Sequence, residues 1–456
     1  MAKLFGTDGI RGVAGEFPLT PESISRIGRA FGECLQSANN SSGRGFVLIG
    51  HDGRASADCI SSAMSAGLAM AGVDSQEAGL ITTPGLATLV RELGALGGAM
   101  ISASHNPAHD NGIKLFNARG EKLDDSQELN IENAALANIE LPGSSKPAPH
   151  AFGQRRAGAA VRPEIYLGGI VERSSIANDA LAGWRIAFDG ANGGGSSLGP
   201  ELFRSLGAEV FEIGTSPDGM NINDRCGALH PEQLVKMVVD NKCNLGLALD
   251  GDGDRSMFVD DRGNIVDGDG VIAACAPDLL ARGKLASATA VVTVMSNFGL
   301  QQFLAARNIK IEQVPVGDRN VVAKLKEKGL SLGAEPSGHV VFGADNYYVG
   351  DGLFTALRVL ELLHRTKVKL SDVAHFDRAE QVLINVRVAR REPLEQLGAV
   401  RDAKNIAEAA LAGLGRVVLR YSGTEPLVRV MVESTRSGDA NLYATKIADA
   451  VRASLA

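Results

Sequence analysis

Short, nearly continuous apolar runs alternate with amphipathic segments along most of the chain. The apolar runs predict strands at 45–50, 184–189, 244–250 and 290–295. Because successive positions are apolar, these strands suit a parallel sheet that is covered on both faces. The amphipathic segments predict helices at 196–206, 231–241, 300–307, 318–328 and 351–364. Strand alternating with helix favours an α/β architecture with mostly parallel sheets.

The first predicted helix has a clear start signal. Thr20 suits the N-cap, and Pro21 suits the first helical position, where no backbone N–H is needed. The apolar stripe that follows comprises Ile24, Ile27, Phe31, Cys34 and Leu35. One face of this helix is therefore expected to be buried.

A strand–loop–strand unit recurs along the chain. In each copy an apolar strand leads into a polar, glycine-rich loop and a second extended segment, at 98–116, 245–259 and 332–342. Such repetition predicts three related α/β domains.

The pattern changes after about residue 372. Strands are predicted at 381–388, 416–420 and 427–433, with helices at 393–412 and 438–455, which indicates a smaller α+β domain. The predicted domains are 1–155, 156–257, 258–372 and 373–456.

Composition narrows the class of protein. The 456 residues include 46 Lys and Arg against 53 Asp and Glu, a net charge of −7, which disfavours nucleic acid and anionic membranes as partners. The five cysteines form no C-x-x-C pair, so neither a disulfide framework nor a thiolate zinc site is indicated. No apolar signal region or membrane-spanning run is evident, and we expect a cytoplasmic protein.

The segment Ser-Ala-Ser-His-Asn-Pro at 102–107, here named the serine loop, follows a buried strand. Pro107 biases Asn106 away from helix and holds the loop open. A serine in this loop, with His105 beside it and Lys114 further along, suits a covalent nucleophile or phosphoryl carrier. A plain polar turn is the alternative.

Asp250, Asp252 and Asp254 alternate with glycines in the segment 250–255, here named the aspartate loop. This spacing can direct three hard oxygen ligands at one small cation. An EF-hand would need Gly where Arg255 stands and Glu where Asp261 stands. Mg²⁺ bound jointly with a phosphate oxygen fits better, with a solvated acidic turn as the alternative.

Two later loops carry polar groups suited to a sugar phosphate. The segment 335–339 offers a carboxylate, a hydroxyl and an imidazole that can hydrogen-bond sugar hydroxyls. The segment 420–426, with Arg429, combines guanidiniums, hydroxyls and a glycine turn, as a phosphate dianion requires. A structural loop and a surface turn are the respective alternatives.

Taken together, these loops resemble those of the α-D-phosphohexomutase superfamily over essentially the whole chain. The matching segments are FGTDGIRG (5–12), SASHNP (102–107), NGIKLF (111–116), DGANG (189–193), VMSN (294–297), VGDR (316–319) and SGTEPLVRVMVE (422–433). The opening and closing segments are similar to the branch that acts on hexosamine phosphates. The implied fold is three related α/β domains with mixed, mostly parallel sheets plus a smaller α+β C-terminal domain, arranged around a central cleft.

The resemblance implies an isomerase, an intramolecular phosphotransferase. It would interconvert glucosamine 6-phosphate and glucosamine 1-phosphate through a phosphoserine enzyme and a glucosamine 1,6-bisphosphate, towards UDP-N-acetylglucosamine and cell-wall precursors. A mutase of mannose or glucose phosphates is the nearest alternative, followed by a Mg²⁺-dependent phosphatase and a non-enzymatic sugar-phosphate sensor. Mg²⁺ and an activating hexose 1,6-bisphosphate are the implied cofactors, in a monomer or homodimer.

The resemblance also assigns roles to residues around the reacting group. Ser104 would be the phosphoserine, which also contributes an oxygen to a Mg²⁺ held by Asp250, Asp252 and Asp254. The residues surrounding the transferring phosphoryl group would be Arg11, His105, Lys114 and Arg255, with Lys114 as general acid/base. His339 would lie near the reacting oxygen.

Further residues are implied in substrate binding. Glu335 and Ser337 would contact sugar hydroxyls. The remaining substrate-binding residues would be Gly317 and Asp318 and, around the phosphate that is not reacting, Arg420, Ser422, Gly423, Thr424 and Arg429. The sequence departs from the family at 333–339, where Ala334 and Pro336 replace a more usual Gly and Gln, and at 226–232.

Overall fold

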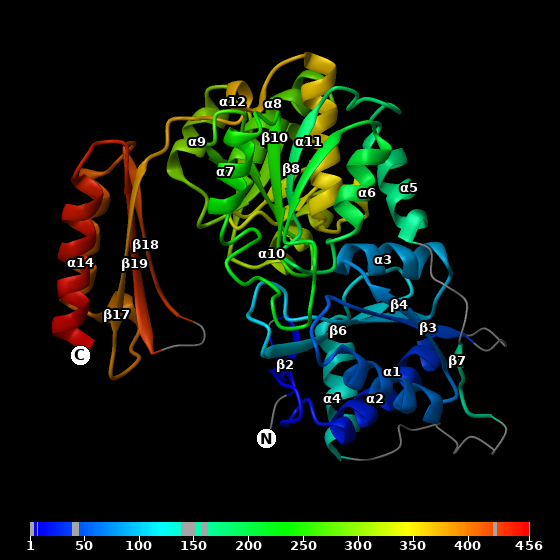
Figure 1. Ribbon diagram of the computed structural model, residues 1–456. Helices are drawn as coiled ribbons and strands as arrows, with labels where there is room; N and C mark the ends of the chain where they lie inside the picture. The colour runs from blue at the N-terminus through cyan, green and yellow to red at the C-terminus, as the bar shows by residue number, and fades with distance from the viewer. Residues whose placement is uncertain are drawn as a thin grey trace. The chain divides into compact units, whose positions relative to one another are not determined.

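The computed structural model describes residues 4–6, 8–38, 45–137, 151–156, 163–422 and 426–455. The chain forms two compact units, Met1–Gly268 with Ser337–Val373 and Asp269–Pro336 with Ala374–Ala456. Figure 1 shows the ribbon of both units. This division passes through the predicted third domain, and the four domain boundaries stay predictions.

The first sheet of the first unit is mixed, in the order β1-β2-β6-β5-β3-β4-β7. Its strands are β1 (Phe5–Gly6), β2 (Gly9–Val13), β3 (Phe46–His51), β4 (Asp74–Leu80), β5 (Gly97–Ile101), β6 (Asp110–Asn117) and β7 (Arg155–Arg156). β3 is parallel to β4 and β5, whereas β6 runs antiparallel to β5 and β2. The helices α1 (Pro21–Ala38), α2 (Ala57–Met70) and α4 (Asp125–Ala137) cover one face, and α3 (Thr83–Glu92) covers the other (Figure 1).

The second sheet of this unit has the order β12-β11-β10-β8-β9. Its strands are β8 (Arg185–Asp189), β9 (Glu209–Ile213), β10 (Leu245–Leu249), β11 (Ser256–Val259) and β12 (Ile265–Val266). β8 is parallel to β9 and β10, and β11 is antiparallel to β10. The other elements of this unit are α5 (Pro163–Ser174), α6 (Leu198–Ser205), α7 (Glu232–Asp240), β16 (Val340–Val341), η2 (Gly343–Asn346), α11 (Gly352–Thr366) and α12 (Leu370–Val373).

The two sheets place equivalent loops at equivalent positions. The serine loop joins the parallel strand β5 to its antiparallel neighbour β6, and the aspartate loop joins β10 to β11 in the same way. Both loops therefore leave the carboxyl end of a parallel strand, where α/β proteins commonly build their sites. The first two copies of the predicted repeat are confirmed by this topology.

The second unit contains a parallel sheet segment and a separate antiparallel sheet. In the parallel segment β13 (Thr289–Thr293) lies between β14 (Lys310–Val314) and β15 (Gly333–Ala334). In the antiparallel sheet β19 (Leu427–Ser434) lies between β17 (Glu380–Arg387) and β18 (Gly415–Tyr421). The accompanying helices and 3₁₀ turns are α8 (Gly268–Ala281), η1 (Ala286–Ala288), α9 (Phe298–Ala305), α10 (Asp318–Lys328), η3 (Leu394–Gln396), α13 (Gly398–Ala410) and α14 (Asp439–Leu455).

Most predicted elements form within a few residues of their expected ends. The helix predicted at 393–412 begins later, at Gly398, because Leu397 has an extended backbone that separates the helix from a preceding 3₁₀ turn. The stripe of α1 is buried as expected, except that Cys34 is half-buried. Among the described residues, no helix combines the length and apolar character that crossing a membrane requires.

The helix α14 offers a direct test of the C-terminal core, because one face packs on the antiparallel sheet. Ile447 is fully buried in that core, whereas Leu442 on the same helix is 46% exposed. We expect Ile447→Ala to cost about 2–5 kcal/mol of stability through the cavity that it leaves. Leu442→Ala, the matched control, should change stability by less than about 0.5 kcal/mol. Differential scanning calorimetry measures both, and equal destabilisation would contradict the assignment of faces.

Candidate active site

Ser104 adopts a backbone conformation that is unusual for serine. Its φ of 53° lies in the left-handed region, which costs a non-glycine residue about 1–3 kcal/mol. The Ser104 amide donates a 2.8 Å hydrogen bond to Ser102 Oγ, and Ser104 Oγ donates a 2.7 Å bond to Asp250 Oδ2. The turn therefore directs the serine hydroxyl at the aspartate loop.

The three carboxylates of the aspartate loop converge on one point. One oxygen each from Asp250, Asp252 and Asp254 lies within 4.8 Å of the others. The three residues are at most 9% exposed. Within the described part of the chain, Asp252 Oδ1 and Asp254 Oδ1 are buried without a hydrogen-bond partner. The donor set and these unsatisfied oxygens fit a small, hard cation such as Mg²⁺.

The raised pKa values of two of these carboxyls also indicate a cation site. Burial raises the pKa of the Asp250 carboxyl well above its usual range, and the charges of Asp254 and Asp252 raise it further. Burial and the charge of Asp252 likewise raise the pKa of Asp254. A cation bound here would relieve this mutual repulsion.

Lys114, on β6, is buried among the acidic groups. Its Nζ lies 2.9 Å from Asp252 Oδ2, 3.0 Å from Asp8 Oδ2 and 4.0 Å from Asp254 Oδ2. Burial lowers the pKa of Lys114, but these carboxylates outweigh burial and hold the pKa well above its ordinary value. Lys114 is therefore a protonated cation here, so it is set up first as a proton donor and not as a base.

Two other basic side chains lie near the serine loop. His105 Nδ1 is 3.4 Å from Ser104 Oγ. Burial, followed by the charge of Arg255, lowers the pKa of His105 to about 4, so its imidazole is neutral at pH 7. Arg11, on β2, forms a 3.0 Å ion pair with Asp8.

Arg255 and His339 meet in an isolated β-bridge, which joins the aspartate loop to residues just before β16. The Arg255 amide donates a 3.2 Å hydrogen bond to Asp250 Oδ1, and Arg255 Nε lies 4.0 Å from Asp254 Oδ1. The His339 ring packs on Gly350, where an added Cβ would lie only 2.1 Å from Nε2. The close approach of this glycine fixes where the imidazole lies.

Sequence reasoning assigned no role to two residues in this network. Thr83 donates a hydroxyl hydrogen bond to Asp252 Oδ2, and its amide donates a 2.8 Å bond to the Asp252 carbonyl. Asp8 binds Lys122 at 2.6 Å as well as Lys114. Asp8 lies within the opening motif 5–12 and could have been found there, whereas Thr83 begins an ordinary helix and carries no such signal.

Three predicted substrate-binding residues come together in the second unit. The Gly317 amide donates a 3.0 Å hydrogen bond to Glu335 Oε1. Gly317 has a φ of 125°, which favours glycine, and Asp318 begins α10 directly after it. Ser337 belongs to the first unit.

Arg420 and Arg429 face each other as cross-strand partners of β18 and β19. Burial lowers the pKa of the Arg420 guanidinium, and the charge of Arg429 lowers it further. Arg429 Nη2 donates a 3.5 Å hydrogen bond to Ser422 Oγ. Gly423 and Thr424 lie outside the described residues. Two like charges placed opposite each other make this edge of the sheet attractive to an anion.

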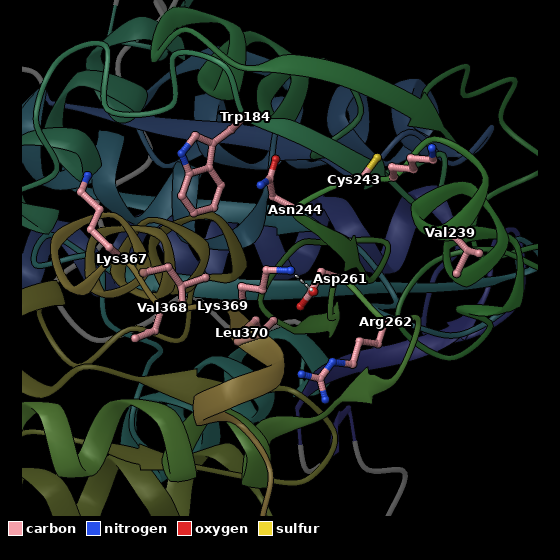
Figure 2. A pocket seen from close by; sticks show the side chains of 12 residues that line it. Trp184, Val239, Cys243, Asn244, Asp261, Arg262, Lys367, Val368, Lys369 and Leu370 are labelled. Atoms are coloured by element: carbon pink, nitrogen blue, oxygen red, sulfur yellow. Dashed lines mark hydrogen bonds and ion pairs between the residues drawn. The ribbon is translucent and has the colours of Figure 1, made fainter.

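A hollow of about 520 Å³ lies at the other end of β10 from the aspartate loop. Figure 2 shows Trp184 and Asn244, which precede β8 and β10, together with the Lys369–Asp261 ion pair. Its lining includes none of the predicted site residues. The predicted chemistry thus belongs to the carboxyl ends of the strands and not to this hollow.

Comparison with known proteins defines the class. Models of the phosphoglucomutase/phosphomannomutase domains I, II and III and of the C-terminal domain match residues 2–141, 164–263, 267–379 and 383–450. The chain belongs to the phosphoglucomutase/phosphomannomutase family, a family of four-domain phosphohexomutases, as its motifs predicted. It is therefore an enzyme of the isomerase class.

Full-length relatives indicate the branch of the family to which the chain is similar. The chain is 44% identical over 457 residues to the phosphoglucosamine mutase of Symbiobacterium thermophilum, with 100% of each chain covered. It is 43% identical to the phosphoglucosamine mutase of Geobacillus kaustophilus, with 99% of each covered. Within the family, the chain thus groups with the phosphoglucosamine mutases.

Solved structures share the fold. A phosphoglucomutase/phosphomannomutase family protein from Burkholderia thailandensis superposes with a TM-score of 0.78 at 25% identity, covering 99% of this chain and 97% of that one. An Aspergillus fumigatus N-acetylphosphoglucosamine mutase, solved with GlcNAc-6P and magnesium, has a TM-score of 0.67 at 18% identity, covering 99% and 96%.

The repulsion among the three carboxylates predicts that Asp254→Asn stabilises the protein without Mg²⁺ and weakens its stabilisation by Mg²⁺. Without divalent cations, Asp254→Asn should raise the midpoint of thermal unfolding, because one buried negative charge is removed. In Mg²⁺ at about 100 times the dissociation constant, the wild type should gain about 2.7 kcal/mol, a gain that the variant should largely lose. Differential scanning fluorimetry in chelator and in MgCl₂ measures both effects. The exposed Asp240→Asn is the control, and an undiminished Mg²⁺ response in Asp254→Asn would contradict the site.

Proposed function

We propose that this protein interconverts glucosamine 6-phosphate and glucosamine 1-phosphate by way of a phosphorylated Ser104. The observation that carries the proposal is the 2.7 Å hydrogen bond from Ser104 Oγ to Asp250, beside the buried Lys114. The full-length likeness to phosphoglucosamine mutases supports this choice of sugar. The product would supply amino sugar for UDP-N-acetylglucosamine and cell-wall precursors.

The proposed reaction consists of two phosphoryl transfers. In the first, the bond between phosphorus and Ser104 Oγ breaks as a bond forms to O1 of glucosamine 6-phosphate, while Oγ gains a proton and O1 loses one by way of Lys114. The resulting glucosamine 1,6-bisphosphate turns around, and its O6 phosphoryl group returns to Ser104 Oγ while the Oγ proton is passed to O6. Glucosamine 1-phosphate leaves, and the phosphoserine is regenerated. A hexose 1,6-bisphosphate would restore any enzyme that has lost its phosphoryl group.

Cationic groups and proton transfer would drive each step. Arg11 and Arg255 would hold oxygens of the phosphoryl group, with His105 and His339 beside the reacting oxygens. Lys114 would donate a proton to the leaving Oγ and recover one from the attacking hydroxyl. Asp250, Asp252, Asp254 and a phosphoserine oxygen would hold one Mg²⁺, which when bound neutralises charge on the phosphoryl oxygens.

Substrate binding is assigned to the remaining loops. Glu335 and Ser337 would contact sugar hydroxyls. Gly317 and Asp318 would also bind the substrate, and the Gly317 amide holds Glu335 through a hydrogen bond. The phosphate that is not reacting would bind the set Arg420, Ser422, Gly423, Thr424 and Arg429. A phosphate site separate from Ser104 would let the bisphosphate bind in either orientation, which a mutase needs.

Replacement of the carrier tests the proposal directly. Ser104→Ala should lower the mutase rate by at least about 1,000-fold, because the covalent route is lost. The wild type treated with glucose 1,6-bisphosphate should gain the mass of one phosphoryl group in an intact-mass measurement, and the variant should not. Ser37→Ala, on α1, is the control. Wild-type turnover by Ser104→Ala would overturn the carrier assignment.

The same coupled assay compares sugars. We expect kcat/KM for glucosamine 6-phosphate to exceed that for mannose and glucose phosphates. The reverse order would favour the alternative function, a mutase of neutral hexose phosphates.

The facing arginines predict an effect on binding more than on chemistry. Arg420→Gln should raise KM for glucosamine 6-phosphate about 10- to 100-fold, because charge-assisted hydrogen bonds to a phosphate are worth about 1.5–3 kcal/mol. Its kcat should fall much less. Steady-state kinetics measures both constants, with the exposed Arg401→Gln on α13 as the control. An unchanged KM would exclude Arg420 from the phosphate site.

A further inference from the structure

Arg54 lies completely buried beneath the serine loop, and all of its N–H groups are used. Its Nε donates a 3.0 Å hydrogen bond to Asp52 Oδ2. The other donors bind backbone carbonyls of the segment 104–110: those of Ser104 at 3.1 Å, Asn106 at 2.9 Å and Asp110 at 2.7 Å, and that of Pro107. A guanidinium offers five N–H donors in a fixed plane, and here five acceptors converge on it.

Asn223 reaches the same loop from the segment that follows β9. Its Nδ2 donates hydrogen bonds to the Ser104 carbonyl at 3.0 Å and to the Asn106 carbonyl at 3.1 Å. These two carbonyls are also bound by Arg54. The serine loop is therefore held by two side chains, Arg54 from the segment after β3 and Asn223 from the segment after β9.

The aspartate loop packs against this contact. A Cβ added at Gly251 would lie 2.6 Å from the Ser104 carbonyl oxygen and 2.8 Å from Asn223 Nδ2. Only a glycine lets the two loops approach this closely. The position of Asn223 thus affects both the serine and its acidic neighbours.

We propose that Arg54 and Asn223 are positioning residues that hold Ser104 in its left-handed conformation throughout the phosphoryl-transfer cycle. This role rests on the proposed function, in which Ser104 alternates between a hydroxyl and a phosphate ester. Only the hydroxyl form can donate the hydrogen bond to Asp250, so that anchor is lost whenever the serine is phosphorylated. The contacts of Arg54 and Asn223 are made to backbone carbonyls and persist in both forms.

Variants of Asn223 provide the cleaner test, because Asn223 is half-buried and Arg54 fully so. Asn223 has a φ of 58°, so Asn223→Gly keeps a compatible backbone while removing the amide, and Asn223→Asp replaces the donor with an acceptor. Asn308→Asp is the matched control, since Asn308 is exposed and has the same φ of 58°. Arg54→Lys keeps the positive charge but removes the planar set of five N–H donors.

We expect Asn223→Gly and Asn223→Asp to lower kcat about 10- to 100-fold, because a misplaced nucleophile loses its alignment, with KM changed less than about twofold. Phosphorylation of Ser104 by glucose 1,6-bisphosphate, followed by intact mass, should slow to a similar degree. Amide hydrogen exchange in residues 102–110 should accelerate, while exchange elsewhere in the first unit and in the control is unchanged. Arg54→Lys should show the same effects, with a larger fall in kcat.

Three results would overturn the role. These are a kcat within twofold of the wild type in both Asn223 variants, a change confined to KM, or faster exchange spread over the whole first unit. If wild-type Ser104 takes up no phosphoryl group from the bisphosphate, the proposed function fails instead. In that case, exchange in 102–110 still reports whether Arg54 and Asn223 hold the loop.

Discussion

The charge balance around Lys114 governs how the site of the first unit is built. Three carboxylates are buried at Asp250, Asp252 and Asp254, and the lysine forms its closest contact in that group with Asp252. Asp8 provides a second partner for Lys114. Burying charged groups is tolerable only when they are paired, so each ion pair here constrains the next. This one cluster is contacted by the hydroxyl of Ser104, by the threonine at the start of α3 and by an arginine of β2.

Local sequence patterns predicted the elements well, because they depend on neighbours along the chain. The apolar run at 45–50 and the amphipathic segment at 318–328 correspond closely to β3 and α10. The late start of α13 was missed, although Gly398, a poor helix former, stands directly after the extended backbone of Leu397. The aspartate loop was predictable because its ligands are separated by single glycines.

The supports of the site were much harder to predict than its reactive groups. Arg54 acts on carbonyls about 50 residues further along the chain, and a backbone carbonyl has no sequence signature. Asn223 lies 119 residues from Ser104 and Thr83 lies 169 residues from Asp252, so both are still more distant in sequence. The raised pKa of Lys114 was also not predicted, because the sequence does not show which acidic groups lie beside this lysine in the fold. Such features require the folded chain, in which distant residues become neighbours.

The ion pair between Lys114 and Asp252 has a consequence for the order in which the protein is made. The lysine belongs to the first sheet and the aspartate to the second, separated by 138 residues of chain. During synthesis Lys114 emerges before Asp252, and among the described residues that precede the aspartate loop Asp8 is its ion-pair partner. The first α/β domain is thus expected to be less stable alone than with the second sheet present, because Lys114 then lacks one carboxylate partner. A chain that stops before the aspartate loop would lack the carboxylate that lies closest to Lys114.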